Sequence, residues 1–235
     1  PLENWFTQPI TSAVLKHKQQ MLNQQYSNVV AVSEDHGGLG AQRELSPFLT
    51  AADEFTDPIA NMALSVDDDL CIMQATGEQR LVAGCVCSPS YWNLQSKIGK
   101  PLRHIHGPVI SMNEKIGDPI ERFINRAPLL QPFERINWFI HGDSQRWHPV
   151  EEPLPQTPVA TWHIRSERET LCRYSDEHLL FTINTRFQPL AAIVDYPQAQ
   201  VDLRATLMNL DADEVDYFGG PDKCEMLIGY LESLL

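Results

Sequence analysis

Two long strand-like segments separated by a three-residue turn constrain this chain more than any other feature of its sequence. The segments span residues 162–174 and 179–187, and Ser175, Asp176 and Glu177 lie between them. Strands that are joined by so short a turn run antiparallel and share hydrogen bonds. The sequence therefore predicts an antiparallel hairpin in the C-terminal half of the chain.

Helices and further strands are expected around this hairpin. They are a second strand pair at 70–74 and 81–87 around the turn 76–78, a strand at 135–141, helices at 11–26, 116–125, 197–209 and 223–235, a helical stretch at 44–66 broken near Pro58, and loops at 33–40 and 146–158. Hairpin-linked strands in the middle and helices at both chain ends favour an α+β fold, with helices packed around an antiparallel sheet. Residues 1–235 are expected to form a single domain.

The charge and composition of the chain restrict its partners. Its 235 residues carry 31 acidic and 18 basic side chains, a net charge of −13, and 43% of them are hydrophobic, enough for a sizeable core. This charge disfavours nucleic acid and anionic membranes and attracts small cations such as amines, although solubility alone also accounts for it. No segment approaches the roughly 18 apolar residues of a membrane span, and residues 1–5 lack the features of a signal peptide. A cytoplasmic protein without membrane or nucleic-acid partners is expected.

The cysteines and the common catalytic motifs argue against several enzyme classes. The five cysteines have neither zinc-site nor iron–sulfur spacing, and Cys85 and Cys87 are predicted to share a strand face and to pack rather than bind metal. The chain contains no phosphate-binding loop, no G-x-S-x-G elbow and no H-E-x-x-H zinc motif. It also lacks a dinucleotide fingerprint, so it has no visible means of taking a hydride from NADPH.

The segment R-H-I-H-G-P-V at 103–109 is the part of the sequence best suited to a cofactor. His106 is followed by Gly and Pro, which keep the backbone rigid and free of bulk. A planar macrocycle can therefore approach while an imidazole nitrogen ligates its iron. His104 lies two residues away, and in an extended chain both side chains share one face. Alternation alone does not choose between the two, and a purely structural histidine is the alternative.

Several short motifs across the chain resemble those of one known family. They are P-S-Y-W at 89–92, K-I-G-K-P-L at 97–102, I-H-G-P-V at 105–109, R-I-N-W at 135–138, R-S-E-R-E-T-L at 165–171 and L-F-T-I-N-T at 180–185. In order and spacing, over residues 44–195, they are similar to the motifs of the haem-dependent oxidative N-demethylase family. Residues 1–43 then form an N-terminal helix and loop, and residues 196–235 form the C-terminal helices. The chain departs from the family pattern at Ile110, where Pro is usual, and at Glu169, where Gln is usual.

This resemblance implies a haem-binding, PAS-type fold, in which helices cover a face of an antiparallel sheet. The characterised activity of the family is the NADPH-dependent oxidation of dimethylamine by O2 to methylamine and formaldehyde. Its electrons arrive through reductase partner subunits that carry FMN and a 2Fe–2S centre. The haem is expected to be haem b, because the sequence has no C-x-x-C-H motif for covalent attachment. A non-catalytic haem gas sensor and a relative without haem are the alternatives.

The resemblance also implies cofactor contacts. His106 aligns with the motif histidine of the family and is the expected axial ligand of the haem iron. Lys97, Arg103 and Arg168 are candidates to pair with the haem propionates, because guanidinium and ammonium groups suit carboxylates. Solvated surface charge is the alternative for these three bases.

Arg165 and Glu167 are the expected catalytic residues. Both match family motif positions, and strand alternation places them on one face together with Glu169 and Leu171. We expect Glu167 to hold the amine cation, because an unpaired ammonium in a dry pocket costs several kcal/mol. Arg165 is expected to polarise bound oxygen. A plain Arg–Glu surface pair is the alternative.

Overall fold

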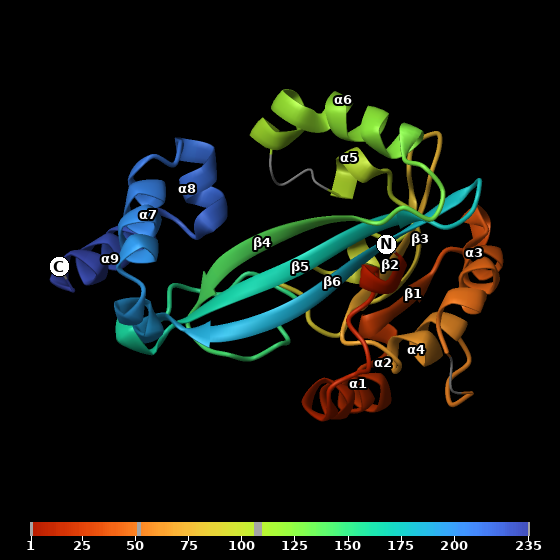
Figure 1. The fold of residues 1–235 in the computed structure, drawn as a ribbon, viewed down its shortest axis with the longest axis horizontal. Coiled ribbons are helices and arrows are strands. Elements are labelled where there is room, and N and C mark those ends of the chain that lie inside the picture. The colour runs from red at the N-terminus through yellow and green to blue at the C-terminus, as the bar shows by residue number, and fades with distance from the viewer. Residues whose placement is uncertain (1, 51–52, 106–109, 235) are drawn as a thin grey trace.

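A six-stranded antiparallel sheet is the centre of the computed structural model, which describes residues 2–50, 53–105 and 110–234. Its strand order is β1-β3-β2-β6-β5-β4. The strands are β1 (Val30–Val32), β2 (Asp69–Gln74), β3 (Leu81–Cys85), β4 (Phe133–His141), β5 (His163–Arg173) and β6 (His178–Pro189). Figure 1 shows the long strands β4, β5 and β6 side by side, extending past the shorter ones at one end of the sheet.

The β5–β6 hairpin determines which side chains share a face of the sheet. Its register places Arg165 opposite Phe187 and Glu167 opposite Thr185, and β4 places Asn137 opposite Glu167 on the other side of β5. Side chains directly opposite each other on antiparallel strands lie on the same face. We call the face that carries these five residues the site face, and the other face the opposite face.

Helices cover both faces of the sheet. On the opposite face, α1 (Ser12–Gln24), α2 (Tyr26–Val29), α3 (Gly38–Leu45) and α4 (Pro58–Ala63) share one apolar cluster with the strands. On the site face, α5 (Leu102–Ile105) and α6 (Ile110–Arg126) lie over the strands (Figure 1). At the far end of β4–β6, a third cluster is formed by α7 (Pro197–Met208), α8 (Ala212–Phe218) and α9 (Pro221–Ser233). Short 3-10 helices are Leu2–Asn4, Glu34–His36, Ser46–Phe48, Leu94–Ser96, Val159–Thr161 and Leu190–Asp195.

Burial of β2 on both faces explains why its four central residues, 70–73, are all apolar. Leu70 and Ile72 belong to the cluster on the opposite face, whereas Cys71 and Met73 belong to the cluster on the site face. Alternating side chains thus enter two separate cores. Each fully buried Leu or Ile contributes about 1.5–3 kcal/mol relative to exposure, so both layers hold the central strands in place.

The predicted α+β class is confirmed. Both predicted hairpins are present, as are the strand that became β4, the loop at 146–158 and the helices α1, α7 and α9. α6 begins earlier than the predicted 116–125 and continues through Pro119. β1, α2, α5 and α8 were not predicted.

The expected loop at 33–40 was wrong in its second half, because α3 begins at Gly38. Gly37 has a φ of +74°, a conformation that glycine adopts without strain, and it ends the preceding 3-10 turn. A Cβ on Gly38 would lie 2.3 Å from the carbonyl oxygen of Val82 on β3. The glycines therefore allow a helix to start in close contact with a strand, rather than marking an irregular loop.

The expected helical stretch at 44–66 was also wrong in its arrangement. The first helix ends at Leu45, and Pro58 begins α4 instead of breaking a helix. Proline suits the first position of a helix, where its missing N–H has no partner to lose and its fixed φ is already helical.

Candidate functional site

The candidate site is built around the carboxylate of Glu167 on β5. Glu167 is 6% exposed and Arg165 is 0% exposed, so this pair is not the surface pair considered as the alternative. Nε of Arg165 donates a 2.8 Å hydrogen bond to Oε1 of Glu167, and Nδ2 of Asn137 donates a 3.3 Å bond to Oε2. Among the described residues Oε2 accepts only that one long bond, so it retains the capacity to accept a further donor.

Arg165 is held by the loop that follows β3. Its Nη1 donates to the carbonyl oxygen of Pro89 at 3.2 Å, and its Nη2 donates to the carbonyl oxygen of Ser88 and, at 3.2 Å, to Oγ1 of Thr185. The guanidinium carbon also lies 5.7 Å from the ring centroid of Phe187. A buried guanidinium must find acceptors in this way, because its desolvation is otherwise very costly. Arg165 is therefore a fixed group that orients Glu167.

Glu169 forms a second carboxylate on the same face. It is buried and pairs with Arg135 of β4, whose side chain is 62% exposed. Burial raises the pKa of Glu169, although the charge of Arg135 acts in the other direction. Tyr217 of α8 lies with its ring 5.7 Å from that of Phe139, and partial burial together with the charges of Glu167 and Glu169 raises its pKa. The hydroxyl of Tyr217 is therefore protonated at pH 7.

A cluster of rings borders Arg165 at the end of β4. Tyr91, with a φ of +53° that is uncommon outside glycine, stacks on His141 at a centroid distance of 4.9 Å. His148 lies 4.6 Å from His141, measured between ring centroids. His141 is 1% exposed, its Nε2 shares a 3.1 Å hydrogen bond with Oγ of Ser90, and its Nδ1 has no partner among the described residues. Burial, aided by the charges of His148 and Arg165, lowers the pKa of His141 to about 3, so its ring is neutral at pH 7.

Beside the carboxylates, the site face becomes apolar. Leu171 of β5 and Phe181 of β6 pack in one cluster with Ile105 at the end of α5 and Ile120 of α6. His106 follows Ile105 directly but lies outside the described residues. An apolar wall next to a few buried polar groups suits a large planar ligand. The described residues around segment 106–109 therefore fit the haem that the resemblance implies.

Two of the expected propionate partners flank this segment. Nζ of Lys97 donates a 3.2 Å hydrogen bond to the carbonyl oxygen of Ile105. Arg103 of α5 pairs with Asp118 and, at 2.5 Å, with Glu121 of α6. Lys97 thus holds the chain before 106–109, and Arg103 links α5 before that segment to α6 after it. His104 is exposed on α5.

Arg168 is not brought together with these bases. It lies on the opposite face of β5, where it pairs with Glu134 at 2.7 Å and donates to the carbonyl oxygen of Asn4. Alternation along a strand explains this placement, because Arg168 is the immediate neighbour of Glu167 and therefore points the other way.

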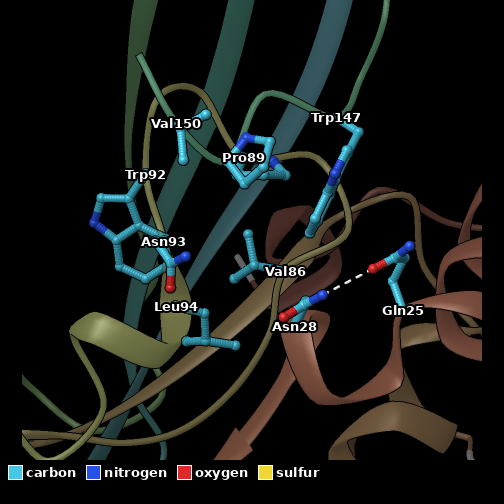
Figure 2. Close-up of a pocket in the computed structure, with 10 residues that line it drawn as sticks. Gln25, Asn28, Val86, Pro89, Trp92, Asn93, Leu94, Trp147 and Val150 are labelled. Atoms are coloured by element: carbon cyan, nitrogen blue, oxygen red, sulfur yellow. Dashed lines mark hydrogen bonds between the residues drawn. The ribbon is translucent and has the colours of Figure 1, made fainter.

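Residues of the loop that holds Arg165 also line a pocket of about 220 Å³ (Figure 2). The indole rings of Trp92 and Trp147 flank it, and Pro89 lies between them. Pro89 is also the residue whose carbonyl oxygen accepts from Arg165. None of the lining residues is charged, so this pocket does not suit an amine cation as well as the Glu167 carboxylate does.

The described residues offer no separate metal centre. Within them, no group of three or more His, Cys, Asp or Glu side chains can hold a metal ion. The five cysteines are buried and unlinked, and Sγ of Cys85 lies 4.0 Å from Sγ of Cys87, as packing predicts. None of the helices in this part of the chain combines the length and apolar character needed to cross a bilayer.

Several residues near the site were missed by sequence reasoning. Tyr217 lies on α8, which was not predicted, although Asp211 and Glu214 form a capping box at its start and such a pair signals a helix. Arg135 and Asn137 belong to the quoted R-I-N-W motif but had no assigned role. Their pairing with β5 follows only from the strand register.

Comparison with known families gives a match over nearly the whole chain. A family model described as "Haem-dependent oxidative N-demethylase, alpha subunit-like" matches residues 9–223. The match includes every strand of the sheet and both residues of the Arg165–Glu167 pair. No protein of curated function matches the chain significantly.

Proposed function

Because the chain belongs to the haem-dependent oxidative N-demethylase, alpha subunit-like family, we propose that it is a haem-binding oxygenase subunit that demethylates a small secondary amine such as dimethylamine. O2 is the oxidant, and the electrons come from a separate NADPH reductase. The observation that carries this proposal is the buried Arg165–Glu167 pair beside an apolar wall. A desolvated anion next to apolar surface is what selective binding of a small alkylammonium requires.

Glu167 binds the amine in this proposal. A dialkylamine is a cation at neutral pH, and loss of its hydration costs several kcal/mol unless an anion pairs with it. Oε1 of Glu167 accepts from Arg165, so the amine N–H donates to Oε2. Among the described residues, Oε2 otherwise accepts only the 3.3 Å bond from Asn137.

Arg165 orients Glu167 and supplies positive charge. Its four hydrogen bonds to Glu167, Ser88, Pro89 and Thr185 prevent the guanidinium from turning away. A fixed positive charge in a dry site stabilises negative charge that develops nearby during the oxidation. That Arg165 polarises bound oxygen stays a prediction.

The haem, when bound, supplies the activation of oxygen. We propose haem b, whose iron His106 would hold, in a PAS-type fold. Lys97 holds the carbonyl oxygen of Ile105 and so fixes the chain just before His106. Lys97 and Arg103 are the proposed propionate partners, because both lie beside segment 106–109.

Partner subunits are also proposed. An alpha subunit implies further subunits, and we assign FMN, the 2Fe–2S centre and NADPH binding to them. The chain has no dinucleotide fingerprint of its own.

The test combines an absorption spectrum with an assay for formaldehyde. Purified protein loaded with haem should show a Soret band that shifts on titration with dimethylamine. NADPH and dimethylamine should yield formaldehyde with an added reductase and none without it. A haem spectrum without amine response or formaldehyde would indicate a sensor, and failure to bind haem would overturn the proposal. Sustained formaldehyde release without a reductase would refute the partner requirement.

A further inference from the structure

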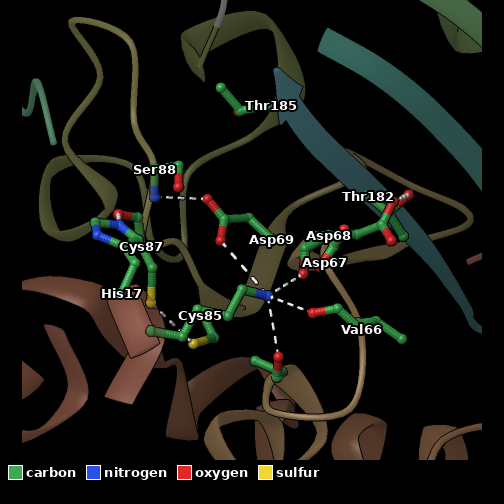
Figure 3. A network of polar contacts seen from close by, with 12 residues as sticks. His17, Val66, Asp67, Asp68, Asp69, Cys85, Cys87, Ser88, Thr182 and Thr185 are labelled. Atoms are coloured by element: carbon green, nitrogen blue, oxygen red, sulfur yellow. Dashed lines mark hydrogen bonds and ion pairs between the residues drawn. The ribbon is translucent and has the colours of Figure 1, made fainter. Parts of the chain in front are cut away.

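Lys18 of α1 is a fully buried base at the edge of the candidate site. It is 0% exposed, and its Nζ donates to the carbonyl oxygens of Ala63, Val66 and Asp68 at 3.0, 2.9 and 2.6 Å. The ammonium also lies 4.0 Å from Oδ1 of Asp69 (Figure 3). An ammonium has three N–H donors, and the three carbonyls take all of them. Lys18 therefore offers Asp69 its charge but no hydrogen bond.

Asp69 connects this base to the Glu167 carboxylate. Its Oδ2 accepts a 2.7 Å hydrogen bond from the backbone N–H of Ser88, and the carbonyl oxygen of Ser88 accepts from Nη2 of Arg165. Figure 3 shows the Asp69 carboxylate beside the backbone N–H of Ser88, and its other oxygen faces the ammonium of Lys18. Arg165 in turn donates to Glu167. A continuous series of buried contacts thus runs from α1 to the middle of β5.

We propose that Asp69, held by the charge of Lys18, is a positioning residue for the amine site. It fixes Ser88, Ser88 fixes Arg165, and Arg165 orients Glu167. This inference rests on the proposed binding of the amine at Glu167. Asp69 itself does not contact the amine.

The hydrogen bond that the Asp69 carboxylate accepts explains why Asp69 positions the loop after β3. Its Oδ1 has no hydrogen-bond partner among the described residues, so the bond to Ser88 is the one directional contact of the carboxylate. A buried ion pair is weak evidence for added stability, because desolvation offsets much of the attraction. What the carboxylate does provide is a fixed acceptor for the loop whose carbonyl oxygens hold Arg165.

Asp68 provides a matched comparison within the same chain. It is as buried as Asp69 and adjacent to it. Its Oδ2 accepts from the backbone N–H of Thr7 and its Oδ1 from Oγ1 of Thr182, which lies on the opposite face. Its side chain therefore has no hydrogen bond to the loop that holds Arg165.

The test compares Asp69→Asn with Asp68→Asn in the haem-loaded protein. In Asp69→Asn, one carboxylate oxygen becomes an NH2 group, so either the N–H of Ser88 or the ammonium of Lys18 faces a donor. We expect dimethylamine to bind about tenfold more weakly, measured as the amine-induced spectral change. Asp68→Asn should alter that affinity less than about twofold. Equal weakening in both variants, or none in Asp69→Asn, would overturn the inference.

A second variant separates position from charge. Asp69→Glu keeps the negative charge beside Lys18 but moves the acceptor by one methylene, and it should also weaken amine binding. It remains informative if Asp69→Asn does not fold. Unchanged affinity in a folded Asp69→Glu protein would overturn the positioning role.

A stability measurement is independent of the proposed function. Denaturant unfolding of Asp69→Asn and Arg165→Lys, singly and combined, should give non-additive losses, because coupled residues share one network. The same cycle with Asp68→Asn should be additive. Additive losses in both cycles would refute the coupling. Wild-type protein that binds haem but no amine would instead overturn the proposed function, and with it the role of Asp69 in amine binding.

Discussion

Arg165 and Glu167 form a buried pair two residues apart on β5, with Nε of Arg165 2.8 Å from Oε1 of Glu167. Removal of one partner from a buried pair costs about 3–5 kcal/mol, whereas exposed pairs contribute about 0–1 kcal/mol. The carboxylate is therefore oriented before any ligand arrives, which lowers the ordering cost of binding. Four predictions concern this pair, the proposed haem ligand and His141.

Replacement of Glu167 by Gln should weaken amine binding without loss of haem. The amide keeps the shape of the side chain but lacks the charge that pairs with an ammonium. We expect at least about a tenfold rise in the dissociation constant for dimethylamine, or about 1.4 kcal/mol, measured from the spectral change. Glu169→Gln is the control, since Glu169 already pairs with Arg135. If only the control loses affinity, Glu169 is the residue that binds the amine.

Replacement of Arg165 by Lys should destabilise the fold more than the same change at Arg168. A lysine keeps the charge but cannot satisfy Glu167, Ser88, Pro89 and Thr185 together. A buried acceptor left without a donor costs about 1–3 kcal/mol. Urea unfolding should show a loss of at least that size.

Arg168→Lys on the same strand is the control for this measurement. Arg168 is 16% exposed and its partner Glu134 is 50% exposed, so the loss should be smaller than that of Arg165→Lys. Equal losses for the two variants would contradict the assignment of Arg165 as the residue that holds the site.

Replacement of His106 by Ala should abolish or strongly shift the Soret band. The reason is the loss of the proposed iron ligand. His104→Ala is the matched control, two residues away on the exposed side of α5, and should leave the spectrum unchanged. The reverse pattern would assign the iron to His104.

His141 should make the protein less stable in mild acid. Its pKa falls from 6.5 to about 3 on folding, so below pH 6.5 the unfolded chain binds a proton that the folded chain does not. Stability is therefore lost as pH falls from 6.5 toward 3, and the loss between pH 7 and pH 5 is about 2 kcal/mol. Urea unfolding at both pH values should show that His141→Asn lacks this contribution. His104→Asn should keep the wild-type pH dependence, and the same dependence in His141→Asn would refute the prediction.

Local patterns in the sequence were sufficient for the elements that carry the site. The turn at Ser175–Glu177 predicted the β5–β6 hairpin, and alternation placed Arg165 and Glu167 on one face. These features depend on neighbouring residues, so sequence reveals them. Local patterns gave wrong predictions at Gly38 and Pro58. Glycine suits a loop as well as the start of a helix, and proline suits a helix break as well as a helix start. Contact between α3 and β3 decided the first case.

By itself, the sequence determined which residues can share a strand face, because side chains alternate along every strand. Only the tertiary structure decided which charged groups meet, because their partners lie far away along the chain. Arg165 donates to Ser88, 77 residues before it, and Arg168 donates to Asn4, 164 residues before it. Alternation shows that these two arginines point in opposite directions. The loop after β3 packs against the site face and accepts hydrogen bonds from Arg165, which makes Arg165 part of the site. The N-terminal segment packs against the opposite face and accepts from Arg168, which leaves Arg168 outside the site.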